Sequence, residues 1–97
     1  MEDIRHYMVP GTCAHLIGIG GVSMNSLGEL LLSRGVPISG SDRLRTDVTA
    51  RLEALGAKIT YEHKPENVEG ASLIVRTAAV HDDNPEIVRA HELGIPV

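Results

Sequence analysis

Apolar residues recur along the chain with two different periods, which predicts strands alternating with helices. Residues 14–19 are nearly continuously apolar, as is typical of a strand buried on both faces of a sheet. Beyond them, Met24, Leu27, Gly28 and Leu31 follow the spacing i, i+3, i+4 and i+7, which is one face of a helix. The first part of the chain is therefore predicted to be a strand followed by a helix.

The same alternation continues to the last residue. Helix-like stretches end at Gly35, Gly56 and Gly94, and a segment that favours strand follows each glycine. We expect further strands at 36–40, 58–61, 73–75 and from Ile95 onward, and further helices at 47–55 and after Asn84. This order predicts the α/β class, with a Rossmann-like parallel sheet of about five strands flanked by helices.

Length and composition restrict the function classes. The chain has 97 residues, so we expect residues 1–97 to be a single domain. A net charge of −4 and only two aromatic residues argue against nucleic acid as a partner. No apolar run approaches the ~18 residues of a membrane span, so no membrane partner is expected. The lone Cys13 and the acidic start of the chain favour a cytoplasmic protein, and the ending inside an expected strand suggests a piece of a larger one.

A glycine-rich loop lies between the first strand and the first helix. It reads Gly-Ile-Gly-Gly-Val-Ser over residues 18–23. Glycines allow the backbone to approach a ligand closely, and a helix start offers free N–H groups and a positive dipole end to phosphate. Ser41 and Asp42 follow the second strand, where an acidic side chain can bind a ribose. Together these features predict a nucleotide diphosphate ligand, and a side chain at Gly20 would occupy its space.

Other interpretations of the same residues remain open. Ser23 stands where the dinucleotide fingerprint has its third glycine, so the loop is also compatible with a glycine turn that binds nothing. Asp42 is also compatible with a plain loop acid or a helix cap. His63 and His81 follow strands on the expected ligand side. Each is compatible with a ligand contact or with an ordinary loop residue. The sequence contains neither a Walker phosphate loop nor a metal-binding histidine pattern, so neither an ATP site of that type nor a metal site is expected here.

Several motifs taken together resemble the Mur ligase family. They are His-Leu-Ile-Gly-Ile-Gly-Gly-Val-Ser-Met at 15–24, Ile-Ser-Gly-Ser-Asp at 38–42, Arg-Leu-Glu-Ala-Leu-Gly-Ala at 51–57, the run 76–86 ending in Asp-Asn-Pro-Glu, and Leu-Gly-Ile-Pro-Val at 93–97. The resemblance covers nearly the whole chain after Gly11. Within the family, the chain more specifically resembles the members that join L-alanine to UDP-N-acetylmuramate.

This resemblance implies a cytoplasmic enzyme of peptidoglycan synthesis with three domains. The chain would be the domain that binds UDP-N-acetylmuramate, without catalytic residues and without a cofactor of its own. A central domain would bind ATP and Mg²⁺, and a C-terminal domain would help to bind L-alanine. An unfinished fifth strand would leave a sheet edge through which a homodimer could form.

The resemblance also implies roles for particular residues. The diphosphate would face backbone N–H groups of the loop and helix start, a set made up of Gly18, Gly20, Gly21, Val22, Ser23 and Met24. Ser41 and Asp42 would lie near the ribose and uracil, and His63 would border the uracil pocket. Thr77 and Ala78 would lie near the diphosphate and sugar. Ser23 departs from the family, because many relatives have glycine there.

Two functions from other classes compete with the ligase. The glycine loop and Asp42 also suit the cofactor domain of an NAD-dependent dehydrogenase, although Ser23 and the Asp-Asn-Pro-Glu segment do not. A stand-alone nucleotide-binding regulatory module would require the natural chain to end near Val97.

Overall fold

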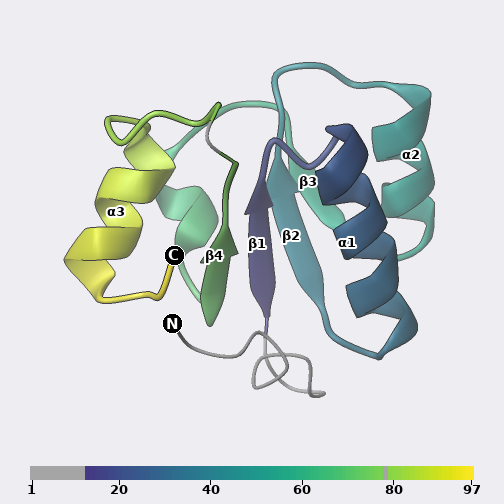
Figure 1. Cartoon of the computed structure of the whole chain (residues 1–97), viewed down its shortest axis with the longest axis horizontal. Helices are drawn as coiled ribbons and strands as arrows, with labels where there is room; N and C mark the ends of the chain where they lie inside the picture. Colours follow the sequence, from purple (N-terminus) through teal and green to yellow (C-terminus); the bar gives the residue numbers. More distant parts are fainter. Residues whose placement is uncertain (1–12, 78) are drawn as a thin grey trace.

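The computed structural model describes residues 13–77 and 79–97 (Figure 1). The elements are β1 (Ala14–Ile17), α1 (Val22–Ser33), β2 (Ile38–Ser41), α2 (Asp47–Ala54), β3 (Lys58–Thr60), the short 3₁₀ helix η2 (Pro65–Val68), β4 (Leu73–Val75) and α3 (Pro85–Leu93). The first four predicted strands and all three predicted helices are present, with small differences at their ends. The sequence pattern did not predict η2.

The strands form one parallel sheet in the order β3-β2-β1-β4. The predicted α/β fold with a parallel sheet and flanking helices is therefore confirmed. Helices α1 and α2 lie together on one face, whereas η2 and α3 cover the other (Figure 1). The chain leaves β1 toward the first face and β4 toward the second. The neighbouring ends of β1 and β4 thus form a topological switch point, the usual ligand position in such sheets.

The sheet has four strands within the described residues, close to the expected number of about five. After α3, Gly94 adopts a left-handed conformation with φ of 71° and turns the chain back toward the sheet. The carbonyl of Pro96 then accepts a hydrogen bond of 2.8 Å from the N–H of Ile74 in β4. The last residues, where a fifth strand was expected, therefore lie beside β4.

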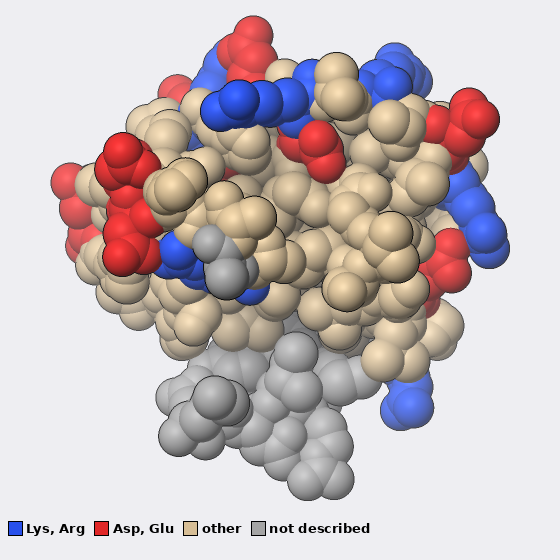
Figure 2. Space-filling view, turned by 45° about the horizontal axis from the view of Figure 1, so that its top comes forward, with Lys and Arg blue, Asp and Glu red and all other residues tan. Residues whose placement is uncertain are grey.

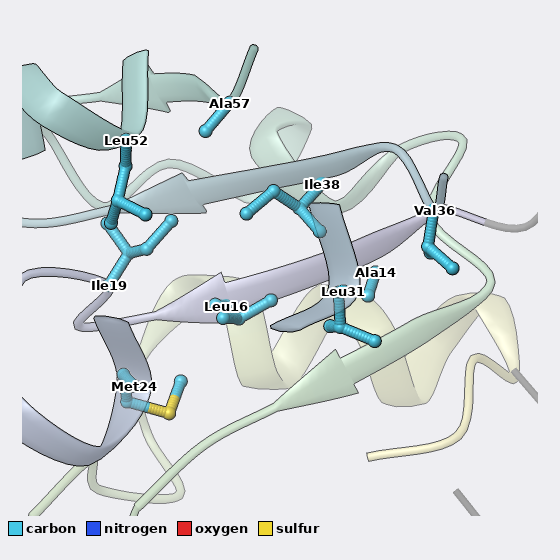
Figure 3. Close-up of a cluster of buried hydrophobic side chains, with 9 residues drawn as sticks. All are labelled: Ala14, Leu16, Ile19, Met24, Leu31, Val36, Ile38, Leu52 and Ala57. Atoms are coloured by element: carbon cyan, nitrogen blue, oxygen red, sulfur yellow. The ribbon is translucent and has the colours of Figure 1, made fainter. Parts of the chain in front are cut away.

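Two apolar clusters hold helices on both faces of the sheet. The larger one packs α1 and α2 against β1 and β2, and Figure 3 shows Leu16 and Ile38 at its centre. The second joins Ile17 and Ile74 to α3 and η2. Neighbouring residues of β1 point to opposite clusters, and the whole strand is buried. This explains why its sequence is apolar without alternation.

Glycine allows close packing at two positions of the first face. A Cβ at Gly28 in α1 would lie 3.2 Å from Cδ1 of Ile38, so the helix approaches the sheet closely here. At Gly40 in β2 a Cβ would lie 2.6 Å from Cδ1 of Ile19 and 2.9 Å from the carbonyl oxygen of Leu16. Only glycine fits there without moving the segment that leads into the glycine loop.

The described residues contain no helix with the length and apolar character needed to cross a membrane.

Candidate functional site

A cleft of about 520 Å³ lies at the carboxyl edge of the sheet. Its walls come from the segments that follow the strands: Gly18 after β1, Arg43 after β2, His63 after β3, and the connection from β4 to α3, including His81 and Asn84. Because this edge includes the switch point between β1 and β4, the cleft is the candidate ligand site. Figure 2 turns this edge toward the viewer and shows basic and acidic side chains side by side around it.

The glycine loop is held by hydrogen bonds of its own backbone. Gly18 adopts a left-handed conformation with φ of 78°, which favours glycine. The N–H groups of Gly18 and Ile19 both donate to the carbonyl of Ser41 in β2, at 2.8 and 3.1 Å. The N–H of Gly21 donates to the carbonyl of Gly18 at 3.0 Å. The loop is therefore anchored to the neighbouring strand and closed on itself.

The side chain of Asp42 provides the remaining anchor. Its Oδ2 accepts a hydrogen bond of 2.9 Å from the N–H of Gly20, and its Oδ1 accepts from the N–H groups of Arg43 and Leu44. A Cβ at Gly20 would lie 2.8 Å from Oδ2 of Asp42 and 3.2 Å from Cγ2 of Thr49. A side chain at position 20 would therefore displace Asp42, whereas the sequence had suggested that it would fill the ligand space.

The N–H groups left for a ligand belong to the first turn of α1. Gly21 is the N-cap, and within the described residues no side chain caps this helix. The N–H groups of Val22, Ser23 and Met24 have no acceptor inside the helix, because the first N–H groups of any α-helix lack one. The N–H groups of Gly20 and Gly21, which were expected to face a diphosphate, donate here to Oδ2 of Asp42 and to the carbonyl of Gly18.

The other predicted site residues do not all lie in the cleft wall. His63 lines the cleft, as expected for a contact residue. The side chain of Ser41 is buried and hydrogen-bonds below the cleft, which differs from its expected place beside a ribose. Met24 contributes its side chain to the core. Thr77 is exposed after β4, and Ala78 lies outside the described residues.

The sequence analysis missed a buried polar network beneath the cleft. Glu86, in the first turn of α3, is fully buried. Its Oε1 lies 2.5 Å from Nε2 of His15, and its Oε2 lies 2.5 Å from Nδ1 of His63. The hydroxyl of Ser41 donates to Oε2 at 2.8 Å. On the other side of the network, Oγ of Ser39 lies 2.7 Å from Nδ1 of His15. The network thus joins β1, β2, the segment after β3, and α3.

These hydrogen bonds keep Glu86 ionised. Burial alone would raise the pKa of its carboxyl group, but hydrogen bonds from His15, His63 and Ser41 outweigh burial and hold the pKa below its usual value. A sequence signal for this network did exist. His15 lies in a strand buried on both faces, where a polar side chain needs a partner. Among the described residues, no group of three His, Cys, Asp or Glu side chains is arranged to hold a metal ion.

The fold and the cleft define a doubly wound parallel α/β domain with a candidate ligand site at its switch point. The model described as "Mur ligase family, catalytic domain" matches residues 14–97. The chain therefore belongs to the Mur ligase family.

Solved structures of this family share the fold. The UDP-N-acetylmuramate-alanine ligase MurC of Thermotoga maritima is 40% identical with a TM-score of 0.81 over 86% of this chain. A murein peptide ligase of Psychrobacter arcticus is 26% identical with a TM-score of 0.81 over 89%. The UDP-N-acetylmuramate:L-alanyl-gamma-D-glutamyl-meso-diaminopimelate ligase of Neisseria meningitides is 24% identical with a TM-score of 0.79 over 88%. The matches span 19%, 18% and 27% of those chains, respectively.

We predict that Asp42→Ala destabilises the glycine loop. The change removes the acceptor of the Gly20 N–H, and lost hydrogen bonds to a charged group weaken folding by about 1–3 kcal/mol. Urea unfolding should show this loss, and hydrogen exchange should show faster exchange of the Gly20 amide. Asp47→Ala, in the exposed first turn of α2, is the control. Unchanged exchange at Gly20 would contradict the role of Asp42 as the anchor.

We also predict that Glu86 contributes stability that is lost in acid. Because its pKa is lowered in the folded chain, the contribution is complete above the unfolded value near ~4.3 and disappears as pH falls through the folded pKa. The difference in unfolding free energy between the native chain and Glu86→Gln should therefore shrink below pH ~4, by up to about 1.4 kcal/mol per pH unit. Urea unfolding at several pH values measures it, and a difference independent of pH would contradict this assignment.

Proposed function

We propose that this chain is the UDP-N-acetylmuramate-binding domain of an ATP-dependent ligase that adds L-alanine to UDP-N-acetylmuramate. The observation that carries the proposal is the open first turn of α1 at the switch-point edge, in a chain 40% identical to a UDP-N-acetylmuramate-alanine ligase. The N–H groups of Val22, Ser23 and Met24 would bind the diphosphate, with the positive end of the helix dipole behind them. The diphosphate would lie between these N–H groups and His63 in the cleft wall, and the cleft would receive the rest of the ligand.

The predicted site residues would then have different roles. Gly18, Gly20 and Gly21 would shape the turn and let the ligand approach, and Asp42 would hold that turn in place. His63 would contact the ligand from the cleft wall. Thr77 and Ala78 would lie near the diphosphate and sugar, as the family resemblance implies. Ser41 would act from below through Glu86.

The rest of the reaction would belong to other parts of the whole ligase. This chain corresponds to less than a third of each related chain described above. ATP, Mg²⁺ and L-alanine would be bound by the remaining domains in the cytoplasm, and this chain would supply no catalytic residue. Two copies of the chain would form a homodimer through the sheet edge beyond β4.

Calorimetric titration tests the function. UDP-N-acetylmuramate should bind this chain, and NADH should not, because family membership favours the ligase over the dehydrogenase alternative. Tight binding of NADH with no response to UDP-N-acetylmuramate would overturn the proposal. The natural gene beyond residue 97 tests the stand-alone module, since a ligase requires an ATP-binding sequence downstream.

Val22→Pro tests the helix N-terminus without removing the helix. Proline is tolerated at the first helical position, and Gly21 has φ −67° and ψ 155°, which a following proline accepts. The change deletes one N–H donor, so affinity for UDP-N-acetylmuramate should fall by about tenfold, as expected for a charge-assisted hydrogen bond. Val22→Ala keeps the N–H and should bind like the native chain. Equal affinities of the two variants would remove this N–H from the site.

A further inference from the structure

His63 is the point where the buried network reaches the cleft. Its Nδ1 lies 2.5 Å from Oε2 of Glu86 and 3.2 Å from the hydroxyl of Ser41. Its side chain is 19% exposed and lines the cleft. The imidazole ring therefore contacts the buried network through Nδ1, and the same side chain lines the cleft.

The chemistry of the partners determines where the protons lie. An ionised carboxylate only accepts hydrogen bonds, so His15 must donate from Nε2 and His63 from Nδ1, while Ser41 donates its hydroxyl proton. A neutral imidazole carries a single N–H. With that proton on Nδ1, the Nε2 of a neutral His63 has a free lone pair directed away from Glu86.

The far side of the network keeps the carboxylate in position. Ser39 lies 2.7 Å from Nδ1 of His15 and so orients the ring with Nε2 toward Glu86. His15 and Glu86 are 1% and 0% exposed, so solvent does not compete for these contacts. Asn84 also accepts from the backbone N–H of Glu86 at 2.9 Å, which anchors the start of α3.

We propose that Glu86 is a positioning residue that holds the His63 proton on Nδ1 and thereby makes Nε2 the proton acceptor of the cleft. When a nucleoside diphosphate sugar binds, Nε2 takes one proton from solvent, and His63 becomes a cation between the Glu86 carboxylate and the diphosphate. One N–H bond forms on Nε2, and no other bond changes. This inference rests on the proposed function, because it requires an anionic ligand in this cleft.

The charged groups around His63 are of both signs. The titratable and charged groups near it are Glu86 from α3, His15 from β1, Arg43 after β2, Glu62 and Lys64 beside it in the chain, and His81 and Asp83 before α3. Arg43 opposes a second cation in the same cleft. A bound diphosphate would add negative charge beside both side chains and so favour the cationic form of His63.

Nitrogen-15 NMR of the ligand-free chain tests the positioning role. Neutral His63 should carry its proton on Nδ1 in the native chain and lose this preference in Glu86→Gln. Glu92→Gln, an exposed change on the same helix, should leave the His63 signals unchanged. A native His63 with its proton on Nε2 would overturn the role of Glu86.

Calorimetry in buffers of different ionisation enthalpy tests the proton uptake. The probe is UDP-N-acetylmuramate, whose diphosphate is substituted at both ends and has no proton to exchange near neutral pH. The native chain and Glu92→Gln should take up the same fraction of a proton, up to one per ligand. His63→Gln, whose side-chain amide keeps an N–H donor for Glu86, should take up none and bind about tenfold more weakly. Glu86→Gln should also lose uptake.

The outcomes separate the two proposals. Uptake in His63→Gln equal to that of the native chain overturns the proton uptake while the function stands. No binding of UDP-N-acetylmuramate by the native chain overturns the proposed function and the proton uptake together. The NMR experiment decides the role of Glu86 in either case, even if Glu86→Gln fails to fold, because the native tautomer alone can contradict it.

Discussion

The packing of α3 on the second face of this sheet depends on the hydrogen bonds to the buried carboxylate of Glu86. Removing a carboxylate from water costs several kcal/mol unless hydrogen bonds replace the lost hydration. Here the replacements come from β1, β2 and the segment after β3, through His15, Ser41 and His63. Helix α3 can therefore dock favourably only when these strands are in register. Within the described residues, no buried side-chain nitrogen or oxygen lacks a partner.

The same principle organises the edge of the cleft, because each loop there is held by a side chain from beneath. Asp42 fixes the turn between β1 and α1 by accepting from Gly20. Glu86 fixes the segment after β3 by accepting from His63. Both anchors act without entering the cleft, so they order the cleft edge before any ligand arrives. Preorganisation of this kind reduces the conformational entropy that binding would otherwise lose.

Local patterns were sufficient for most of the fold, and long-range pairing was not visible in them. The apolar periods and the glycine stops predicted the parallel sheet, and the helix expected after Asn84 is α3, with Asn84 as its cap. His15 and Glu86 are 71 positions apart, and an acidic residue in a first helical turn has a sufficient local explanation in the helix dipole. Ser41 was expected near the ligand from its place after the second strand and from the family resemblance. Position alone did not reveal that its side chain turns inward toward Glu86.

The net charge of −4 is compatible with an anionic ligand because of how the cleft is built. Long-range repulsion between exposed charges is screened over about 8–10 Å at physiological ionic strength. In the proposed function the N–H groups at the start of α1 would act at hydrogen-bond distance, and Arg43 lies in the cleft wall itself. Such local donors would outweigh the average charge of the surface. A domain that binds through backbone donors needs few basic side chains, which is consistent with a cleft edge where both signs of charge lie side by side (Figure 2).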